Sequence, residues 1–440
     1  MREMKDSGIE WIGAIPQDWK TDRLQWHLKE INVSNNPIQT KNILSLTIET
    51  GVIPYAEKGN QGNKAKEDYS QYKIALPDTL VINSMNVIIG AVGISQYFGC
   101  VSPVYYVFEP IEGTDLRYIY YLFTNTGFQK EMRKYAKGIL EIRLRISSND
   151  MLKRIVPSPP FKEQQRIDDY LDKMCAEIDA VLEKTRASIE EYKKLKQAVI
   201  TQAVTKGIRG DRPMKNSGIE WIGEIPAEWS VVRQKYFWNT IESGVSVNAA
   251  DKPVDNSEQY GVLKTSAVSK FMFIPTEHKQ VNLEEYGRVS CPVRADSIIA
   301  SRMNTPELVG ACGYVQNNYP NLFLPDRLWQ ITFKDELSPK YAWYYLSGIR
   351  VRQYISSLST GTSSSMQNIS QSQYGNIFIT IPSIGEQSEI AKYLDEKCNS
   401  VDALIAKKQQ YLIEIENYKK SLIYEYVTGK KEVKTNVLAD

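Results

Sequence analysis

The sequence contains one unit twice, and this repeat constrains the fold more than any other feature. The phrase SGIEWIGAIPQDW begins at Ser7, and SGIEWIGEIPAEW begins at Ser217 with only three positions changed. Further along, DTLVINSMN from Asp78 corresponds to DSIIASRMN from Asp296. A repeat has to be recognised first, because it predicts related structural units rather than one undivided core. The chain is therefore expected to form two similar halves.

The correspondence continues to the end of the chain with a growing offset. It is 210 at the opening phrase (217 minus 7) and 218 at the second phrase (296 minus 78). It reaches 223 where EQQRIDDYLDKMCAEIDA from Glu163 matches EQSEIAKYLDEKCNSVDA from Glu386. The second copy is therefore expected to carry longer loops.

The first part of each copy reads as a mixed α+β globule. Short apolar runs rich in Val, Ile and Tyr, such as LVINSM, PVYYVFE, SIIASRM and LWQITF, are typical of strands bounded by turns. Helical patterns interrupt them in LRYIYYLFTNTGFQKEMRKYA and PKYAWYYLSGIRVRQYISSL. Each copy is thus expected to open with a compact domain of mixed class.

The second part of each copy is predicted to be one long helix. Residues 162–203 contain neither Gly nor Pro, and neither do residues 386–427. Such a helix of about 42 residues spans roughly 60 Å at a rise of 1.5 Å per residue. The Pro clusters just before each helix, SPPF at Ser158 and IPSI at Ile381, are interpreted as rigid ends of a strand.

Apolar residues step along both helices by three and four, which favours a coiled-coil seam. The stripes are wider than a two-helix seam needs, so helices of a partner are expected to pack there as well; alternatively, the two helices only cover each other. The expected interface residues are Leu171, Met174, Ile178, Val181, Tyr192, Leu195 and Val199 in the first helix, and Leu394, Val401, Leu404, Tyr411, Ile415, Tyr418 and Leu422 in the second.

Composition excludes several classes of protein. Hydrophobic residues make up 42% of the chain, which argues against general disorder. No run of eighteen apolar residues occurs, so no membrane span and an intracellular location are expected. The five cysteines lie far apart without a CxxC pair, which predicts reduced structural thiols and no metal site. With 54 basic and 52 acidic residues, only local patches can favour a polyanion ligand.

No catalytic motif is recognised. The two histidines, His27 and His278, do not correspond between the copies, and neither a Walker-type loop nor a GxSxG motif occurs. SPPF imitates a turn of amino-methyltransferases, but no Gly-rich loop for a methyl donor accompanies it, and the second copy reads IPSI instead. The chain is therefore interpreted as a binding protein.

Loop chemistry suggests what it binds. Amides can pair with adenine edges in a bidentate way, and lysines suit phosphates. Solvated loops without a ligand are the alternative interpretation. The candidate DNA-binding residues are Lys58, Asn60, Gln61, Asn63, Lys64, Lys66, Lys137, Arg143 and Arg145 in the first copy, and Arg302, Asn304, Ser363, Ser364, Ser365, Gln367 and Asn368 in the second.

Together, the doubled SGIEWIGxIPxxW phrase, the Pro-rich turn into EQQRIDDYLD or EQSEIAKYLD, and the helix exits AVTKG and YVTGK resemble the DNA-specificity subunit of type I restriction-modification enzymes. The resemblance covers nearly the whole chain. It implies an α+β fold with two tandem target-recognition domains, joined by two long antiparallel coiled-coil helices with pseudo-twofold symmetry. The expected boundaries are residues 1–160 and 211–384 for the recognition domains, and 161–210 and 385–440 for the helical regions.

The resemblance also implies a role and partners. Each recognition domain would read one half of a bipartite, asymmetric site in double-stranded DNA, and the helix pair would set the spacing between the halves. Two methyltransferase subunits would dock on the helices and use S-adenosylmethionine to methylate adenine at N6. Motor-nuclease subunits would use ATP and Mg²⁺. The specificity chain itself would bind no cofactor, have no catalytic site, and act in the prokaryotic cytoplasm.

Within this resemblance the two copies differ in their reading loops. Arg143 and Arg145 in the first copy are expected to correspond to Ser365 and Gln367 in the second, which indicates unlike half-sites. Two other functions stay open. A self-contained DNA amino-methyltransferase would bind a methyl donor by itself, and a coiled-coil adaptor without a DNA role would show no salt-sensitive DNA binding.

Deleting one heptad from the first helix, residues 183–189, is predicted to change the spacing between the half-sites or to abolish assembly. The deletion removes two turns and keeps the apolar pattern in phase, so the helix shortens without losing its seam. Sequencing the methylated motif in cells that carry the variant measures the spacing. An unaltered motif with intact activity would contradict the role of the helices in spacing.

Overall fold

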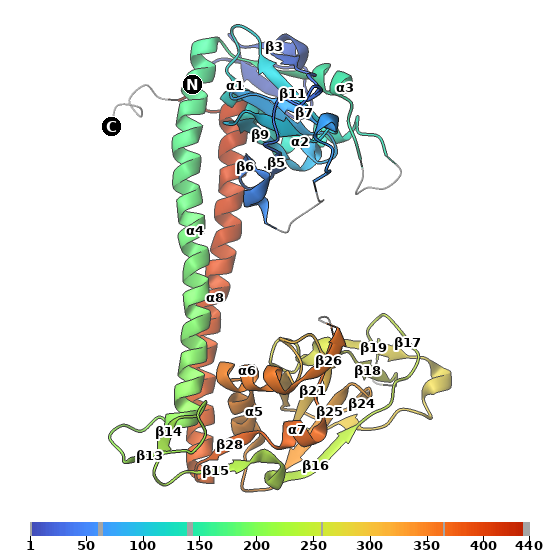
Figure 1. The fold of residues 1–440 in the computed structure, drawn as a ribbon, viewed down its shortest axis with the longest axis vertical. Coiled ribbons are helices and arrows are strands. Elements are labelled where there is room, and N and C mark those ends of the chain that lie inside the picture. Colours follow the sequence, from blue (N-terminus) through green and yellow to red (C-terminus); the bar gives the residue numbers. More distant parts are fainter. Residues whose placement is uncertain (1, 60–64, 139–143, 257, 364–365, 434–440) are drawn as a thin grey trace. The chain divides into compact units, whose positions relative to one another are not determined.

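The computed structural model describes residues 2–59, 65–138, 144–256, 258–363 and 366–433, and Figure 1 shows the element order. Contacts divide the described residues into two units. Unit 1 comprises those of Met1–Arg186 and Gln409–Asp440, and unit 2 is formed by Ala187–Lys408. This spatial division differs from the chain-order boundaries expected above, because each unit includes one end of each long helix.

The two long helices are α4 (Phe161–Lys206) and α8 (Ile384–Val427). Two residues separate each helix from a short strand, β12 (Ile155–Ser158) or β28 (Phe378–Ile381), and the first of the two is a proline. The predicted order of strand, proline and helix is thus confirmed. Proline ends the strand without loss of a ladder hydrogen bond and leaves the helix free to start behind it.

Within each unit α4 and α8 lie side by side and antiparallel (Figure 1). In unit 1, Tyr170 stacks on Tyr426 at 4.5 Å between ring centroids, and Lys419 pairs with Asp179 at 2.6 Å. In unit 2, Lys196 pairs with Asp402 at 2.6 Å, and Arg209 pairs with Glu389 at 2.7 Å. Residue numbers rise along one helix as they fall along the other, which confirms the antiparallel coiled coil.

The buried seam of α4 follows a strict alternation of four and three residues. Its members from the start of the helix to its middle are Leu171, Cys175, Ile178, Leu182, Thr185 and Ile189, each less than 9% exposed. This alternation is the heptad pattern that keeps one face of a helix toward its partner. At the corresponding end of α8, Leu394 and Cys398 are buried in the same register.

Five of the expected interface residues do not lie in the seam between the two helices. Their side chains are 40% to 53% exposed, because the apolar stripe read from sequence is wider than one coiled-coil seam. Of the other nine, Leu171, Ile178, Leu394 and Leu422 are buried, and Met174, Tyr192, Val199, Val401 and Ile415 are half-buried. The five exposed residues are Val181, Leu195, Leu404, Tyr411 and Tyr418.

Each unit has a four-stranded antiparallel sheet with the same order. In unit 1 it is β4-β11-β8-β9, made of Leu28–Glu30, Tyr105–Pro110, Thr79–Asn83 and Val92–Ser95. In unit 2 it is β16-β25-β21-β23, made of Trp238–Ser243, Leu328–Phe333, Ser297–Ser301 and Cys312–Val315. The four apolar runs predicted as strands therefore lie in β8, β11, β21 and β25.

The predicted helical patches each break into two helices. Asn125 caps the start of α2 with its side chain, which separates α1 (Leu116–Thr124) from α2 (Thr126–Arg133). Gly348 separates α5 (Pro339–Ser347) from α6 (Ile349–Leu358) in unit 2. The short helices α3 (Ser148–Leu152) and α7 (Gln371–Gly375) follow later in each copy.

The repeated SGIEWIG phrase forms an N-terminal strap in each unit. It connects β1 (Met4–Asp6) to β2 (Ala14–Pro16) in unit 1 and β13 (Met214–Asn216) to β14 (Glu224–Pro226) in unit 2. Trp19 and Trp229, at the end of each phrase, are no more than 1% exposed. The phrase thus packs against its domain as an apolar strap. The next strands, β3 (Lys20–Arg23) and β15 (Ser230–Arg233), pair with β12 and β28.

A buried tyrosine ties each mixed domain to the end of a long helix. The Tyr118 hydroxyl donates to the Val427 carbonyl at 3.0 Å, and the Tyr341 hydroxyl donates to the Val204 carbonyl at 3.3 Å. Each domain therefore holds the last turn of the helix that belongs to the other copy of the repeat. The last carbonyls of a helix lack partners within the helix, so these bonds satisfy groups that burial would otherwise leave unpaired.

The remaining strands differ between the units. Unit 1 has two-stranded sheets from β5 (Leu44–Thr47) with β6 (Gly51–Pro54), and from β7 (Lys73–Ala75) with β10 (Gly99–Val101). Unit 2 has a five-stranded sheet of β17 (Ala249–Ala250), β19 (His278–Val281), β18 (Gly261–Leu263), β24 (Tyr319–Phe323) and β20 (Pro292–Val293).

Asp168 is a buried carboxyl that only the first copy contains. Its side chain is fully buried on α4 and forms an ion pair with Arg117 Nε at 2.8 Å. The second copy has Ala391 at the corresponding position. Burial first, and the neighbouring Asp115 next, raise the pKa of Asp168 to about 8, and Arg117 opposes the shift. Because this folded-state pKa lies above the unfolded value of 3.8, the stability that Asp168 contributes is present at low pH and is lost as the pH rises toward 8.

Asp168→Asn is therefore predicted to remove a pH-dependent loss of stability. The melting temperature of the variant relative to wild type should rise by a few degrees between pH 5 and pH 8, because the amide never ionises. Thermal unfolding followed at both pH values measures this. Glu177→Gln, at an exposed position of the same helix, is the control and should leave the trend unchanged. A variant that loses stability equally at both pH values would show instead that the Arg117 ion pair dominates.

Candidate nucleic-acid interface

A hairpin in unit 2 brings several candidate residues together. It consists of β26 (Thr360–Ser363) and β27 (Met366–Asn368), and β22 (Met303–Asn304) pairs with β27 on its other side. The register places Asn304 opposite Gln367, and Met303 opposite Asn368. The backbone amide of Ile369 donates to the carbonyl of Arg302 at 3.0 Å, which fixes the hairpin to the strand edge. Asn304, Gln367 and Asn368 are all half-buried, so part of each amide side chain faces solvent.

Gly361 allows the two strands of this hairpin to approach closely. A Cβ at this position would lie 2.3 Å from the Met366 carbonyl oxygen and 2.9 Å from the Gln367 amide nitrogen. No side chain fits there without movement of the backbone. The correspondence between Gly361 and Gly138 in the sequence therefore has a structural reason in unit 2.

Unit 1 has the same frame with different side chains. Lys137 and Arg145 form an antiparallel bridge in which their backbone amides and carbonyls exchange hydrogen bonds of 2.8 and 2.9 Å. The amide of Ile146 then donates to the carbonyl of Ser84 at 3.2 Å, as Ile369 does to Arg302. Both cationic side chains are exposed. A basic hairpin in unit 1 thus corresponds to an amide-rich hairpin in unit 2.

The structure corrects the correspondence between the two hairpins by one residue. In unit 1 the bridge pairs Lys137 with Arg145. In unit 2 the residues 223 positions further along, Thr360 and Asn368, pair in the same way. Arg145 therefore corresponds to Asn368. The sequence had predicted that it corresponds to Gln367. The difference matters because neighbouring residues of a strand point to opposite faces.

A second group of candidates lines a cavity of about 440 Å³ in unit 1. Lys58 and Lys66 line this cavity together with Tyr55 and Tyr72. Contacts with the two tyrosines hold the lysine segments in place. The Lys66 amide donates to the Tyr72 hydroxyl at 2.8 Å, and the Lys58 ammonium lies 5.1 Å from the centre of the Tyr55 ring. The two lysines are thus held near the end of β8, although they are distant from it in sequence.

Two residues that sequence reasoning did not single out belong to the same region. Asn86 lines the cavity and is exposed, and in the repeat it corresponds to Asn304 of β22. The correspondence of Asn86 with Asn304 can be read from the matching sequences SMN and RMN. Lys73 lies close enough to Arg145 for the two positive charges to oppose each other; burial is the main reason that the pKa of Lys73 is lowered, and Arg145 adds to it. A basic cluster of Lys73 and Arg145 could be recognised only from the fold.

Seven of the candidate residues lie outside the described residues. They are Asn60, Gln61, Asn63, Lys64, Arg143, Ser364 and Ser365. Ser363 is described as the last residue of β26 by its backbone only. The described candidates are Lys58, Lys66, Lys137, Arg145, Arg302, Asn304, Gln367 and Asn368. The structure places them in three clusters: the cavity and hairpin of unit 1, and the hairpin of unit 2.

Both histidines have structural partners. His27 Nδ1 lies 3.1 Å from the Thr114 hydroxyl, and burial lowers the pKa of His27. His278 Nε2 accepts from the amide of Val254 at 3.0 Å, which leaves Nδ1 to donate to the Pro275 carbonyl.

Three further features bear on function: the state of the cysteines, possible metal-binding clusters, and the length and apolarity of the helices. All five cysteines are free, and burial raises the pKa of Cys175 and Cys398, which correspond in the repeat, to about 11. Across the described residues no group of three or more His, Cys, Asp or Glu side chains is arranged to hold a metal ion. None of the helices within the described ranges combines the length and the apolarity that a membrane crossing needs.

Comparison with known families gives one match that covers most of the chain. The family described as "Type I restriction modification DNA specificity domain" matches residues 16–191 and again residues 226–417. The two matched segments coincide with the two copies of the repeat.

Among curated proteins, the sequence is similar to specificity subunits of type I restriction enzymes from Methanocaldococcus jannaschii. It is 27% identical to a protein named as the MjaX specificity subunit, over 96% of both chains. It is also 27% identical to the MjaVIII specificity subunit, over 73% of this chain and 71% of that protein.

Among solved structures, the fold is similar to a chain from a study of complex assembly and conformational transition of the type I R-M system. The TM-score is 0.70 at 15% identity, with 95% of this chain and 99% of the other covered. The HsdS subunit from Thermoanaerobacter tengcongensis has a TM-score of 0.51 at 14% identity, with 95% and 98% covered. At such low identity the likeness concerns the fold alone.

Gly361→Ala is predicted to loosen the hairpin of unit 2, because the added methyl group meets the Met366 carbonyl. Hydrogen exchange of the peptide that contains Ile369 should become at least tenfold faster, since the amide of Ile369 depends on this register. Gly385→Ala is the control, because a Cβ there meets no atom within 4 Å. Unchanged exchange in Gly361→Ala would contradict the close approach of the two strands.

Proposed function

Because the chain belongs to the family of type I restriction-modification DNA specificity domains, we propose that each of its units reads one half of a bipartite DNA site. The observation that carries this proposal is the pair of hairpins. They have the same backbone frame and the same attachment to a strand edge, but one presents Lys137 and Arg145 and the other presents Gln367 and Asn368. A shared frame with unlike side chains suits two readers of unlike sequences.

The side chains suit different base edges. Arginine pairs in a bidentate way with the O6 and N7 atoms of guanine, whereas asparagine and glutamine pair with N6 and N7 of adenine. Lys58 and Lys66, which line the cavity of unit 1, suit contacts with the phosphates that flank these bases. Such contacts position the protein on DNA without reading its sequence. The half-site of unit 1 is therefore expected to depend on a guanine, and that of unit 2 on an adenine.

The long helices would serve two further purposes. A continuous helix has a fixed rise per residue, so α4 and α8 would set the number of unread base pairs between the half-sites, as a flexible linker could not. Their exposed apolar residues, including Val181, Leu195 and Tyr411, suit the docking of partner subunits.

The partners supply the chemistry. We propose two methyltransferase subunits, which use S-adenosylmethionine for N6-adenine methylation, and motor-nuclease subunits, which use ATP and Mg²⁺. The specificity chain then contributes the choice of sequence, in keeping with the structural roles of His27 and His278 in the described residues.

Arg145→Ala and Gln367→Ala are each predicted to relax recognition at one half-site only. The loss of one bidentate base contact costs about 1 to 3 kcal/mol of discrimination, which is roughly a tenfold to hundredfold gain in methylation of altered sites. Sequencing of methylated bases in cells that express the variant chain with its methyltransferase measures both half-sites at once.

Lys58→Ala is the matched control for these variants. A phosphate contact carries no sequence information, so this change should weaken DNA binding uniformly and flatten its salt dependence without relaxing either half-site. Motifs that stay unchanged in Arg145→Ala and in Gln367→Ala would remove both residues from the reading set. A wild-type chain that binds no DNA even with its methyltransferase would reject the function as a whole.

A further inference from the structure

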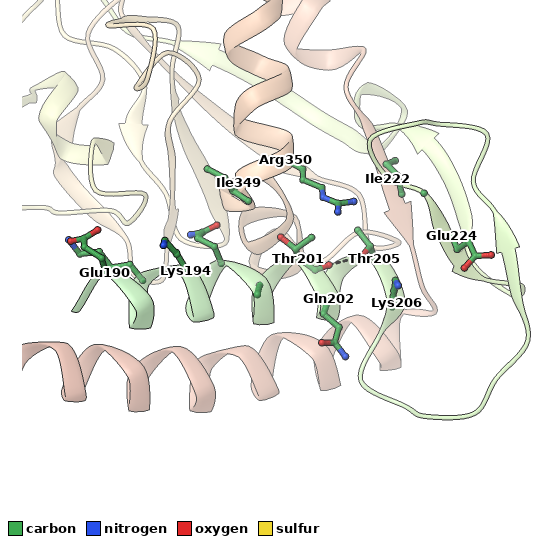
Figure 2. A pocket seen from close by; sticks show the side chains of 14 residues that line it. Glu190, Lys194, Thr201, Gln202, Thr205, Lys206, Ile222, Glu224, Ile349 and Arg350 are labelled. Carbon is green, nitrogen blue, oxygen red and sulfur yellow. Dashed lines mark hydrogen bonds and ion pairs between the residues drawn. The ribbon is translucent and has the colours of Figure 1, made fainter. Parts of the chain in front are cut away.

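Unit 2 contains a groove that the DNA-reading role does not use. It has a volume of about 890 Å³ and lies between the last turns of α4, the strap of the second copy and the start of α6. Figure 2 shows Thr201 and Thr205 on α4, with Arg350 reaching over them from α6 and Ile222 beside it on the strap. The repeated SGIEWIG phrase therefore forms one wall of this groove.

The corresponding place in unit 1 is filled by the chain itself. Tyr424 of α8 corresponds to Thr201 in the repeat, and its hydroxyl donates to the carbonyl of Ile12 at 3.3 Å. The Lys430 ammonium donates to the neighbouring carbonyl of Ala14. Ile12 corresponds to Ile222, so the strap is closed by a tyrosine in unit 1 and left open by a threonine in unit 2.

The floor of the groove carries polar atoms that lack partners. Gln197 Oε1 and Thr201 Oγ1 are shielded from solvent and make no hydrogen bond within the described part of the chain. Buried polar atoms are nearly always hydrogen-bonded, because an unpaired one costs about 1 to 3 kcal/mol. In unit 1 a hydrogen-bond donor, the Tyr424 hydroxyl, reaches the strap carbonyl of Ile12, and Thr201 stands at the corresponding position in unit 2.

The floor also continues into an apolar space. A small cavity of about 10 Å³ lies below Thr201 and is walled by Trp221 and Tyr345. These two rings lie 6.3 Å apart, and Trp221 also stacks on Tyr354 at 5.4 Å. This cavity is too small to admit a ring, so an aromatic occupant would lie in the larger groove.

The rim carries charges of both signs, because exposed Glu224 of β14 lines the groove together with the cations Arg350 and Lys206. Arg350 is exposed and Lys206 stands at the end of α4, whereas Lys193 is already paired with Glu190 at 2.7 Å, and Lys194 with Glu191 at 2.8 Å. Arg350 makes one long hydrogen bond, 3.3 Å, to the carbonyl of Trp221. Its remaining donors and the Lys206 ammonium favour carboxylates on the segment that carries the ring.

We propose that this groove anchors a tyrosine from an acidic segment of a methyltransferase subunit, and that only unit 2 offers this anchor. The proposal rests on the proposed function, because it presumes that methyltransferase subunits dock on this chain. Tyr424 serves as the precedent for the occupant, since the chain places a phenol against the same strap in unit 1. As a consequence, the two methyltransferase subunits bind unequally, and the one at unit 2 binds first.

Thr201→Tyr tests the proposal, because it fills the groove as Tyr424 fills its counterpart. The full-length chain is titrated with the purified methyltransferase subunit, and native mass spectrometry follows the complexes with one and with two subunits. Wild type should show two binding steps of different affinity. Thr201→Tyr should weaken the tighter step at least tenfold and leave the weaker step unchanged.

Arg350→Glu keeps the test decisive if Thr201→Tyr disturbs folding. Arg350 is exposed, so the change reverses the charge of the rim without entering the core, and it should weaken the same step. Glu183→Tyr is the matched control, because it adds the same ring at an exposed position of α4 outside the groove, and it should bind as wild type does.

Three results would overturn the proposal. If Thr201→Tyr and Arg350→Glu both bind like wild type in each step, the groove is not an anchor, while the proposed function stands. If Thr201→Tyr changes only self-association of the chain, the groove takes a second copy of this chain. If the wild-type chain does not bind the methyltransferase subunit, and does not bind DNA when that subunit is present, the proposed function fails together with the anchor.

Discussion

The antiparallel contact between α4 and α8 is the interaction on which both units depend. The domain of the first copy packs on the start of α4 and on the end of α8, where Tyr118 holds the Val427 carbonyl. The second domain uses the other two helix ends, where Tyr341 holds the Val204 carbonyl. Neither copy of the repeat can therefore complete its core alone, because each needs the last turns of the other copy's helix. Loss of either helix would expose apolar surface in both units.

Charged and polar contacts that fix each domain to its helices are kept between the copies. Arg2 pairs with Glu163 and Arg212 with Glu386, and Tyr121 and Tyr344 bind Asp172 and Asp395. The side chains that differ include Arg145 and Asn368 on the hairpins, and Tyr424 and Thr201 at corresponding positions of the long helices. One scaffold thus carries two unlike hairpins and two unlike surfaces beside the strap.

Much of the framework could be predicted from residues alone. The repeat, the strands around LVINSM and LWQITF, the prolines before each helix and the two uninterrupted helices all follow from local pattern and backbone chemistry. Other features depend on neighbours in space. Val181 and Tyr411 fit the apolar stripe, but only the structure shows that they lie outside the seam between α4 and α8, because a stripe does not reveal how narrow that contact is. The register of the hairpins was off by one residue for a similar reason: sequence spacing does not show which residues pair across a turn.

The sequence by itself determined that the protein is a doubled unit with mixed domains and long helices, because periodicity, proline and glycine act through the local backbone. Only the tertiary structure decided how these parts combine. It placed one end of each helix in each unit, gathered Lys58 and Lys66 at the end of β8, and joined the strap, α4 and α6 into an open groove in unit 2. Such arrangements depend on contacts between residues far apart in the chain, and a change as small as tyrosine to threonine decides whether a surface is filled or open.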